Sequence, residues 1–262
     1  MVRSRVPRKI LGIIPARYAS SRFPGKALAR LHKLSIIQHV YDRAVQARTL
    51  TSVIIATDDR RIFDEAREFG AIAQMTSEDH ASGTDRVAEV ALSHDDVDLV
   101  VNIQGDEPLI DPAAIDAAVR SIADDAAIPM ATLKKRIEDA EDFTDPNIVK
   151  VVTGLSGNAL YFSRSPIPLV RDGGGFAFFK HIGLYVYRRD FLLRYRYLPV
   201  GPLERAEKLE QLRALENGFT IKVTETSYDS IGVDTPADLE KITARLPYGP
   251  PADAKTVART TN

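Results

Sequence analysis

Three cations lie close together near the start of the chain. Arg17, Arg22 and Lys26 fall among small residues whose backbone amides can approach a ligand closely. This composition suits a polyphosphate, because arginine clamps phosphate oxygens in a bidentate fashion and lysine supplies a point charge. The segment is not a Walker A loop, since Ala27 follows Lys26 where that motif needs Ser or Thr. The alternative is an ordinary basic surface loop.

Two aspartates follow apolar stretches in different parts of the chain. Asp106 lies in the segment Gln104–Pro108, directly after an apolar run, and Asp234 precedes Thr235 near the C-terminus. Mg²⁺ usually takes one or two carboxylates together with phosphate oxygens, so Asp106 is a candidate ligand. Turn formation is the alternative for Asp106, and helix capping shared with Thr235 is the alternative for Asp234. The sequence alone does not pair these two positions.

A third polar segment, Asp79–Arg86, leads into a predicted helix. Ser82, Gly83 and Thr84 stand at its start. The amides of such a helix N-terminus can bind ligand oxygens, although simple N-capping explains the same residues.

The second half of the chain carries scattered candidates for binding an anionic substrate. Arg164, His181 and Tyr185 can donate hydrogen bonds, but single residues of these types on strands are commonly structural. A predicted helix, Pro202–Glu216, has a leucine stripe and a polar face. That face carries Glu204, Glu207, Glu210 and Gln211. Most of such a face is solvated surface, which leaves one or two functional residues at best.

The composition excludes several classes of site. The 262 residues include 35 Lys and Arg, 36 Asp and Glu and no cysteine, with a net charge of −1. Disulfides, thiolate metal sites and cysteine nucleophiles are therefore excluded, and the net charge argues against bulk nucleic acid as the main partner. The five histidines lack the i,i+4 spacing of a helical zinc pair. A hard cation on carboxylates is the expected metal. No apolar run reaches membrane length, so we expect a cytoplasmic protein.

Apolar runs alternate with helical patterns in the first half. Continuous runs predict buried strands, and apolar residues at helical spacing predict the helices between them. The predicted strands are Lys9–Ile14, Ser52–Thr57 and Asp98–Gln104, and the predicted helices are Ile36–Ala47, Arg61–Phe69 and Thr84–Leu92. This alternation indicates a mostly parallel α/β sheet that binds its ligand at the carboxyl ends of the strands.

The second half has a different pattern. Its predicted elements are a hairpin of Ile148–Thr153 with Ala159–Ser163, a glycine-rich loop over Val170–Phe178, strands His181–Arg188 and Phe219–Thr224, the helix Pro202–Glu216, and a last helix that begins at Pro236 with Thr235 as its cap.

Eight of these segments occur in the order seen in one known family. They are Ile14–Lys26, Ala56–Asp58, His80–Arg86, Asn102–Pro108, Ala159–Arg164, His181–Tyr185, Leu209–Arg213 and Gly232–Pro236. Together they resemble the 3-deoxy-manno-octulosonate cytidylyltransferases, also called CMP-Kdo synthetases, from about Ile10 to Leu246. The loop around Gly173 is shorter than in some members of that family.

The resemblance implies a Rossmann-like nucleotide-diphospho-sugar transferase fold, with a mostly parallel central sheet and a smaller mixed sheet portion. Residues 1–248 would form a single nucleotidyltransferase domain, in which about 135–215 make the sugar-binding and dimerising portion, and 249–262 would be a flexible tail. The implied reaction is CTP plus 3-deoxy-D-manno-octulosonate (Kdo) giving CMP-Kdo and diphosphate, for lipopolysaccharide biosynthesis. The implied enzyme is a homodimer with no nucleic-acid or membrane partner.

The resemblance also implies residue roles. The CTP phosphates would be held by Arg17, Arg22 and Lys26, and the base would lie near Ser82, Gly83 and Arg86. Gln104 would sit between nucleotide and sugar, and Mg²⁺ would be bound by Asp106 and Asp234. The sugar-acid pocket would be lined by Arg164, His181, Tyr185, Glu210 and Gln211, and secondarily by Glu204. Arg17, Lys26, Asp106 and Asp234 would be the catalytic set.

Three alternatives remain open. A CMP-sialic acid or amino-Kdo synthetase of the same fold is the nearest one. An NAD-dependent oxidoreductase is a second, disfavoured by the missing Gly-x-Gly-x-x-Gly motif. An inert nucleotide-binding module is the third.

Overall fold

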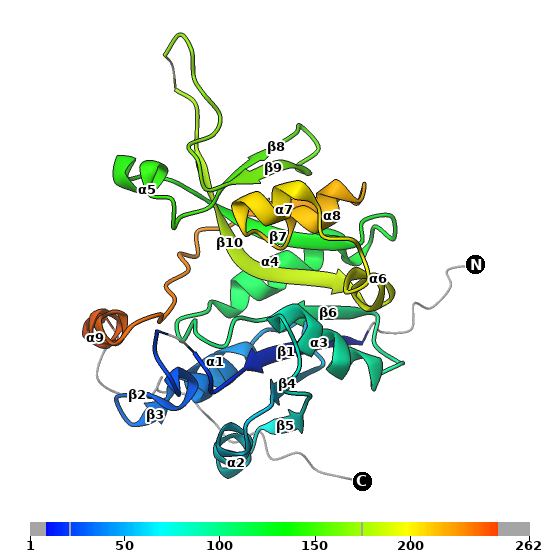
Figure 1. The fold of residues 1–262 in the computed structure, drawn as a ribbon, viewed down its shortest axis with the longest axis vertical. Helices are drawn as coiled ribbons and strands as arrows, with labels where there is room; N and C mark the ends of the chain where they lie inside the picture. Colours follow the sequence, from blue (N-terminus) through cyan, green and yellow to red (C-terminus); the bar gives the residue numbers. More distant parts are fainter. Residues whose placement is uncertain (1–8, 21, 174, 246–262) are drawn as a thin grey trace.

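A central sheet runs through the protein in the strand order β11-β7-β10-β6-β1-β4-β5 (Figure 1). The computed structural model describes residues 9–20, 22–173 and 175–245. These strands are β1 (Ile10–Ala16), β4 (Ser52–Thr57), β5 (Ile72–Met75), β6 (Leu99–Asn102), β7 (Met130–Arg136), β10 (Phe179–Arg188) and β11 (Ile221–Glu225). Neighbouring strands pair in parallel except at β10, which is antiparallel to both β6 and β7. The predicted mostly parallel sheet is confirmed.

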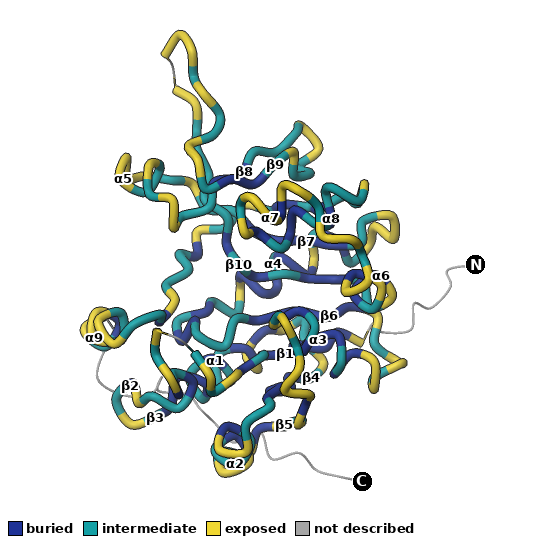
Figure 2. Tube along the Cα trace, in the orientation of Figure 1, coloured by how far each residue is buried: buried dark blue, intermediate teal, exposed yellow. Residues whose placement is uncertain are grey.

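The apolar runs are continuous because both faces of the sheet are buried. In β1, Ile10 and Ile14 pack into one hydrophobic cluster while Leu11 and Ile13 pack into the other. Helices cover each face, and the strands lie buried between them (Figure 2). Residues of α1 (Ile36–Ala44), α2 (Arg60–Glu68), α4 (Pro112–Ala123) and α9 (Pro236–Arg245) join the first cluster, and residues of α3 (Gly83–Leu92), α6 (Arg189–Tyr195) and α8 (Leu212–Glu216) join the second.

A smaller mixed portion extends from the far end of β10. The predicted hairpin is confirmed as β8 (Lys150–Thr153) and β9 (Ala159–Ser163), and β8 also pairs with β10. The connection from β9 to β10 rises beyond this hairpin in Figure 1. The remaining short elements are the 3₁₀ turn η1 (Lys26–Leu28), β2 (Arg30–Leu31), β3 (Leu34–Ser35) and α5 (Ala140–Thr144). No helix in the described ranges is long and apolar enough to cross a membrane.

The predicted single helix Pro202–Glu216 is wrong. The chain forms α7 (Pro202–Glu207), reverses at Lys208 in the left-handed region (φ 53°), and then forms α8. The Glu216 carboxylate accepts the backbone amides of Leu203 at 2.8 Å and Glu204 at 2.9 Å. One helix therefore caps the amino end of the other, which a straight helix could not do. The leucine spacing continues through the break, so periodicity alone did not reveal it. The predicted tail, 249–262, lies outside the described residues.

The turn after β6 lies against the end of β1. A Cβ built on Gly105 would stand 2.7 Å from the carbonyl oxygen of Pro15. Only a glycine fits this approach, because the obstacle is backbone rather than a flexible side chain. Gly105 thus brings Asp106 next to the segment that carries Arg17.

We predict that Gly105→Ala lowers the free energy of unfolding by about 1–3 kcal/mol, because the two backbones must separate. Thermal unfolding followed by circular dichroism would show a Tm several degrees lower. Gly175→Ala is the matched control, since a Cβ there meets nothing within 4 Å. A Gly105→Ala protein with the wild-type Tm would contradict the packing argument.

Candidate active site

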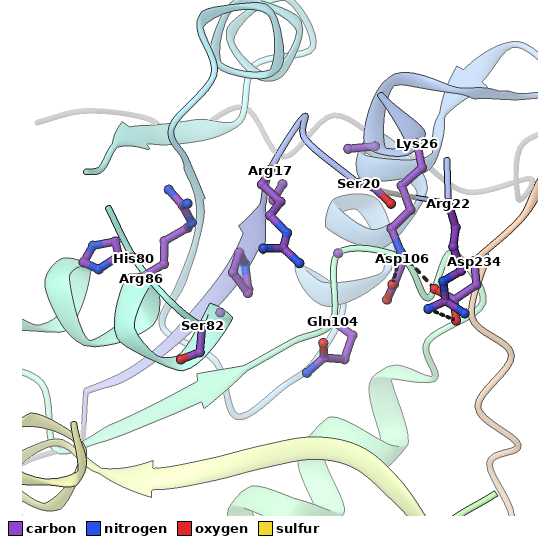
Figure 3. Close-up of a pocket in the computed structure, with 15 residues that line it drawn as sticks. Arg17, Ser20, Arg22, Lys26, His80, Ser82, Arg86, Gln104, Asp106 and Asp234 are labelled. Carbon is purple, nitrogen blue, oxygen red and sulfur yellow. Dashed lines mark hydrogen bonds and ion pairs between the residues drawn. The ribbon is translucent and has the colours of Figure 1, made fainter. Parts of the chain in front are cut away.

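A cavity of about 350 Å³ lies at the carboxyl ends of β1 and β6. Its lining comes from four segments: the turn after β1, the start of α3, the turn after β6 and the approach to α9. The lining residues are Pro15, Ala16, Arg17, Ser20, Arg22, Lys26, Ala27, His80, Ser82, Gly83, Arg86, Gln104, Gly105, Asp106 and Asp234. Figure 3 shows Lys26 and the two aspartates toward one end, with Ser82, His80 and Arg86 toward the other. The predicted phosphate, base and metal residues therefore share one cavity.

Asp106 and Asp234 meet around one lysine. The Lys26 ammonium donates a hydrogen bond to Asp106 and lies 3.3 Å from Asp234 Oδ1 and 3.2 Å from the Val233 carbonyl oxygen. Arg22 adds an ion pair to Asp234 at 3.0 Å. Two carboxylates in one cavity repel each other, and these cations offset that repulsion. The structure supplies the pairing that the sequence left open.

The turn after β1 has its own anchors. Gly25 adopts φ 72°, and its amide donates to the Tyr18 carbonyl at 2.9 Å. The Tyr18 ring packs so closely on Gly25 that a Cβ there would lie 2.9 Å away, and the Arg61 guanidinium stacks 3.3 Å above the centre of that ring. Arg61 is also paired with Asp59, so α2 braces the turn that presents Lys26.

Asp234 is presented by the start of α9. Asp238 Oδ2 accepts the backbone amides of Thr235 at 2.9 Å and Asp234 at 3.2 Å, and Thr235 Oγ1 accepts the Asp238 amide at 3.3 Å. The predicted cap at Thr235 is confirmed. Capping is thus carried by Thr235 and Asp238, which leaves the Asp234 carboxylate free to face the cavity.

The acidic pair has the donor chemistry of a magnesium site that is completed by a ligand. Among the described residues, no group of three or more His, Asp or Glu side chains could hold a metal alone. Mg²⁺ commonly binds through one or two carboxylates plus substrate phosphates. Asp106 and Asp234 therefore fit Mg²⁺ only in company with phosphate oxygens. Next to them Glu107 is buried, and burial raises its pKa to about 7.

The other side chains that line the cavity are of two kinds: some are held by contacts within the protein, and others are available to a ligand. Ser82 caps α3 by accepting the Asp85 amide at 3.1 Å. Arg86 is buried and paired with Asp58, which makes its guanidinium a brace for the cavity wall. Arg17 is exposed and makes no ion pair within the described ranges, so its charge is available to a ligand. Gln104 donates to the Gly183 carbonyl at 3.0 Å.

His80 also lines the cavity, and the residue-role expectations did not include it. Its ring is hydrogen-bonded to Glu89 of α3. The signal for it was present in the sequence, since His80 belongs to the same motif as Ser82 and Arg86.

Glu210 and Gln211 sit where the chain reverses between α7 and α8. Glu210 accepts the Thr84 hydroxyl at 3.0 Å and lies 3.4 Å from Ser82 Oγ, and burial raises the pKa of its carboxyl. Gln211 Oε1 accepts the Tyr185 hydroxyl at 3.2 Å. We call Thr84, Tyr185, Glu210 and Gln211 the group around Glu210. Because Ser82 lies beside Glu210 and also lines the cavity, this group adjoins the cavity.

The other sugar-side candidates are held by protein contacts. Arg164 donates to the carbonyl oxygens of Glu207 at 2.8 Å and Pro146 at 3.0 Å. Both carboxylate oxygens of Glu204 are taken by Arg213, at 2.9 and 2.6 Å, which gives Glu204 a structural role. Glu207 was predicted only as part of a polar helix face. Its carboxylate accepts a hydrogen bond from Ser163 Oγ at 2.6 Å and so joins α7 to β9.

His181 is enclosed by aromatic rings. Phe162 and Tyr185 lie 5.0 and 5.4 Å from its ring centre, and Nε2 is 2.9 Å from Thr132 Oγ1. Burial lowers the pKa of His181 to about 3, so the imidazole is neutral at physiological pH. It can therefore exchange hydrogen bonds with a ligand but supplies no charge.

Comparison with known proteins gives consistent matches. A family model described as Cytidylyltransferase matches residues 11–225. A 3-deoxy-manno-octulosonate cytidylyltransferase of Solibacter usitatus is 62% identical, over 90% of this chain and 94% of that protein. One of Geobacter metallireducens is 55% identical, over 91% and 98%. The solved structure of a CMP:2-keto-3-deoxy-manno-octonic acid synthetase complexed with CTP superposes with a TM-score of 0.87 at 46% identity, covering 90% of this chain and 98% of that one.

We predict that the His181 imidazole stays neutral down to about pH 4. The folded pKa is about 3 against 6.5 for the free side chain, so between these values the unfolded state binds more protons. The stability contribution is complete above pH 6.5 and is lost as the pH falls toward 3. Nitrogen NMR shifts of the imidazole, assigned with His181→Phe, would follow the titration, and that variant should lose part of the acid sensitivity of unfolding. A midpoint near pH 6.5 would contradict the assignment.

Proposed function

The chain belongs to the cytidylyltransferase family, and we propose that it transfers the cytidylyl group of CTP to Kdo, giving CMP-Kdo and diphosphate for lipopolysaccharide synthesis. The observation that carries this proposal is the convergence of Lys26, Asp106 and Asp234 beside the basic turn after β1. That arrangement suits a nucleoside triphosphate accompanied by a divalent cation. The named relatives support the choice of CTP and Kdo.

The reaction needs positioning and charge neutralisation more than a protein nucleophile. The anomeric hydroxyl of the sugar acid attacks the α-phosphorus in line with the departing diphosphate. Arg17 and Arg22 bind the phosphates from the mouth of the cavity, and Lys26 binds them from its floor. Their positive charge stabilises the diphosphate as it leaves. Ser82 and Gly83, at the start of α3, face the nucleotide base.

Asp106 and Asp234 are the residues that would hold Mg²⁺. When bound, Mg²⁺ supplies Lewis-acid stabilisation of charge at the α-phosphate. In the free protein Lys26 and Arg22 together neutralise the two carboxylates, and the same two cations are the groups that would bind phosphate oxygens. Gln104 reaches toward Gly183 of β10 and so stands between the nucleotide and sugar sides.

Sugar recognition falls to the group around Glu210. Neutral His181 and the hydroxyl of Tyr185 offer hydrogen bonds, while Gln211 and Glu210 accept them from sugar hydroxyls. Arg164 supplies the positive charge that attracts the sugar carboxylate. Burial raises the pKa of the Tyr185 hydroxyl, with the Glu210 charge adding to the effect, so Tyr185 stays protonated as a donor.

We predict diphosphate release from CTP with Kdo, at a kcat/KM at least about 100-fold above that with UTP, ATP or sialic acid. A coupled diphosphate assay over these substrates, and over amino-Kdo, would measure it with Mg²⁺ and with EDTA. EDTA should abolish turnover. A preference for sialic acid or amino-Kdo would overturn the substrate assignment.

Asp234→Ala is the control for the metal assignment in that assay. Loss of one of the two carboxylates that would hold Mg²⁺ should reduce kcat by at least about 100-fold, because removal of a group that only orients a metal ligand already costs about 10–100-fold. Near-normal turnover of this variant at saturating Mg²⁺ would remove Asp234 from the metal site.

We also predict a homodimer in which β8, β9 and residues 164–173 and 175–178, together called the arm, meet a second copy. The arm exposes Leu160, Leu169 and Phe176, and Leu169 is 91% exposed. Several large apolar side chains exposed on one portion of a fold favour an interaction surface there. Sedimentation velocity should show a dimer that the double variant Leu160→Asp, Leu169→Asp converts to a monomer. Leu92→Asp, at the exposed end of α3, should leave the dimer intact. A monomeric wild-type protein at micromolar concentration would contradict the proposal.

A further inference from the structure

A buried hydrogen bond joins the two segments that carry the acidic pair. The Tyr228 hydroxyl donates to Glu107 Oε2 at 2.9 Å, and both residues are only 7% exposed. Glu107 directly follows Asp106 in the turn after β6. Tyr228 belongs to the segment 226–235, which leads from β11 to α9 and carries Asp234 next to its last residue.

The segment 226–235 contains no helix or strand, so the position of Asp234 depends on the cap at the start of α9 and on the contacts that the segment makes with its surroundings. The Val233 amide donates to the Asp106 carbonyl at 2.9 Å. Asp229 is paired with Lys135 at 2.9 Å and with Lys180 at 2.8 Å, which ties the segment to β7 and β10 rather than to the turn that carries Asp106. The bond between Glu107 and Tyr228 is shielded from water, and a buried bond of this kind is costly to break.

A carboxylate pair binds a cation well only when its separation is held by surrounding groups. Here Glu107 interacts with Tyr228 and Ser230 of the segment 226–235, and the hydrogen bond from Tyr228 ties that segment to the turn that carries Asp106. Tyr228 also packs in the hydrophobic cluster that contains Val233, so its ring and its hydroxyl restrain the same segment. Nothing in the reaction described above uses either residue.

We propose that Glu107 and Tyr228 are positioning residues, whose hydrogen bond holds Asp106 and Asp234 at the separation needed to bind a divalent cation with a triphosphate. This inference rests on the proposed function for the identity of that ligand. It gives Glu107 the role of a hydrogen-bond acceptor, and a neutral side chain with the same acceptor would serve as well.

We predict that Tyr228→Phe weakens Mn²⁺ binding in the presence of CTP by about tenfold, the loss typical when a group that orients a metal ligand is removed. Binding of CTP in EDTA should be unchanged, because the basic turn after β1 is untouched. Mn²⁺ binding is measured by electron paramagnetic resonance of the free ion without Kdo, so no turnover is required. Circular dichroism checks that the variant is folded.

Two further variants separate positioning from general stability. Glu107→Gln keeps an oxygen that accepts the Tyr228 hydroxyl and should bind Mn²⁺ like the wild type. Ile122→Val, in the buried face of α4, lowers stability away from the cavity and should also leave Mn²⁺ binding unchanged.

Wild-type Mn²⁺ affinity in Tyr228→Phe would overturn the inference. An equal loss in Glu107→Gln would also overturn it, since the charge rather than the hydrogen bond would then matter. If the wild type binds Mn²⁺ with CTP but releases no diphosphate with Kdo, the proposed function fails while the comparison of variants still decides the positioning role.

Discussion

The attraction between Lys26 and two carboxylates is the constraint on which the cavity depends. Asp106 and Asp234 come from distant segments, and each would repel the other without a cation between them. Their meeting explains features that otherwise look unrelated. Gly105 lets the turn after β6 approach β1, and the left-handed Gly25 aims Lys26 across the cavity. The glycine at each of these two positions is therefore needed so that Lys26 can contact the two carboxylates.

The second side of the cavity depends on a chain reversal rather than on charge. Glu216 of α8 accepts the free amides at the start of α7, and this contact requires the chain to turn back at Lys208. The reversal brings Glu210 to the first residues of α3, where it accepts the Thr84 hydroxyl. The antiparallel strand β10 brings Tyr185 to the same place. The start of α3 is therefore shared between the cavity and the group around Glu210.

Local patterns were sufficient to predict β1, β4 and β6 and the polar residues that follow them. The apolar runs of β1, β4 and β6 are continuous because both faces are buried, and polar residues begin where each strand leaves the core. The hairpin β8–β9 and the cap at Thr235 were also predicted correctly, because their signals lie within a few neighbouring residues.

What the sequence did not predict depends on contacts between distant residues. The leucine spacing runs on through Lys208, since the cap from Glu216 carries no local signal. Arg86 lines the cavity as expected, but its pairing with Asp58 was not predicted, because Asp58 follows a different strand. The helix α4 and the strand β7 were not predicted. In β7 the apolar residues are followed by Lys134, Lys135 and Arg136, which hides its membership of the sheet.

The net charge of −1 conceals two opposed sets of groups in one cavity. The basic turn after β1 and the acidic pair neutralise each other in the free protein, which is why both can be presented to the same cavity without a ligand. Each set is also the counter-charge of one component of a metal nucleotide, the cations for its phosphates and the carboxylates for its metal. A triphosphate without a metal would be repelled by the two carboxylates, and a metal cation without a triphosphate would be repelled by Lys26 and Arg22. The cavity therefore complements the pair better than either component by itself.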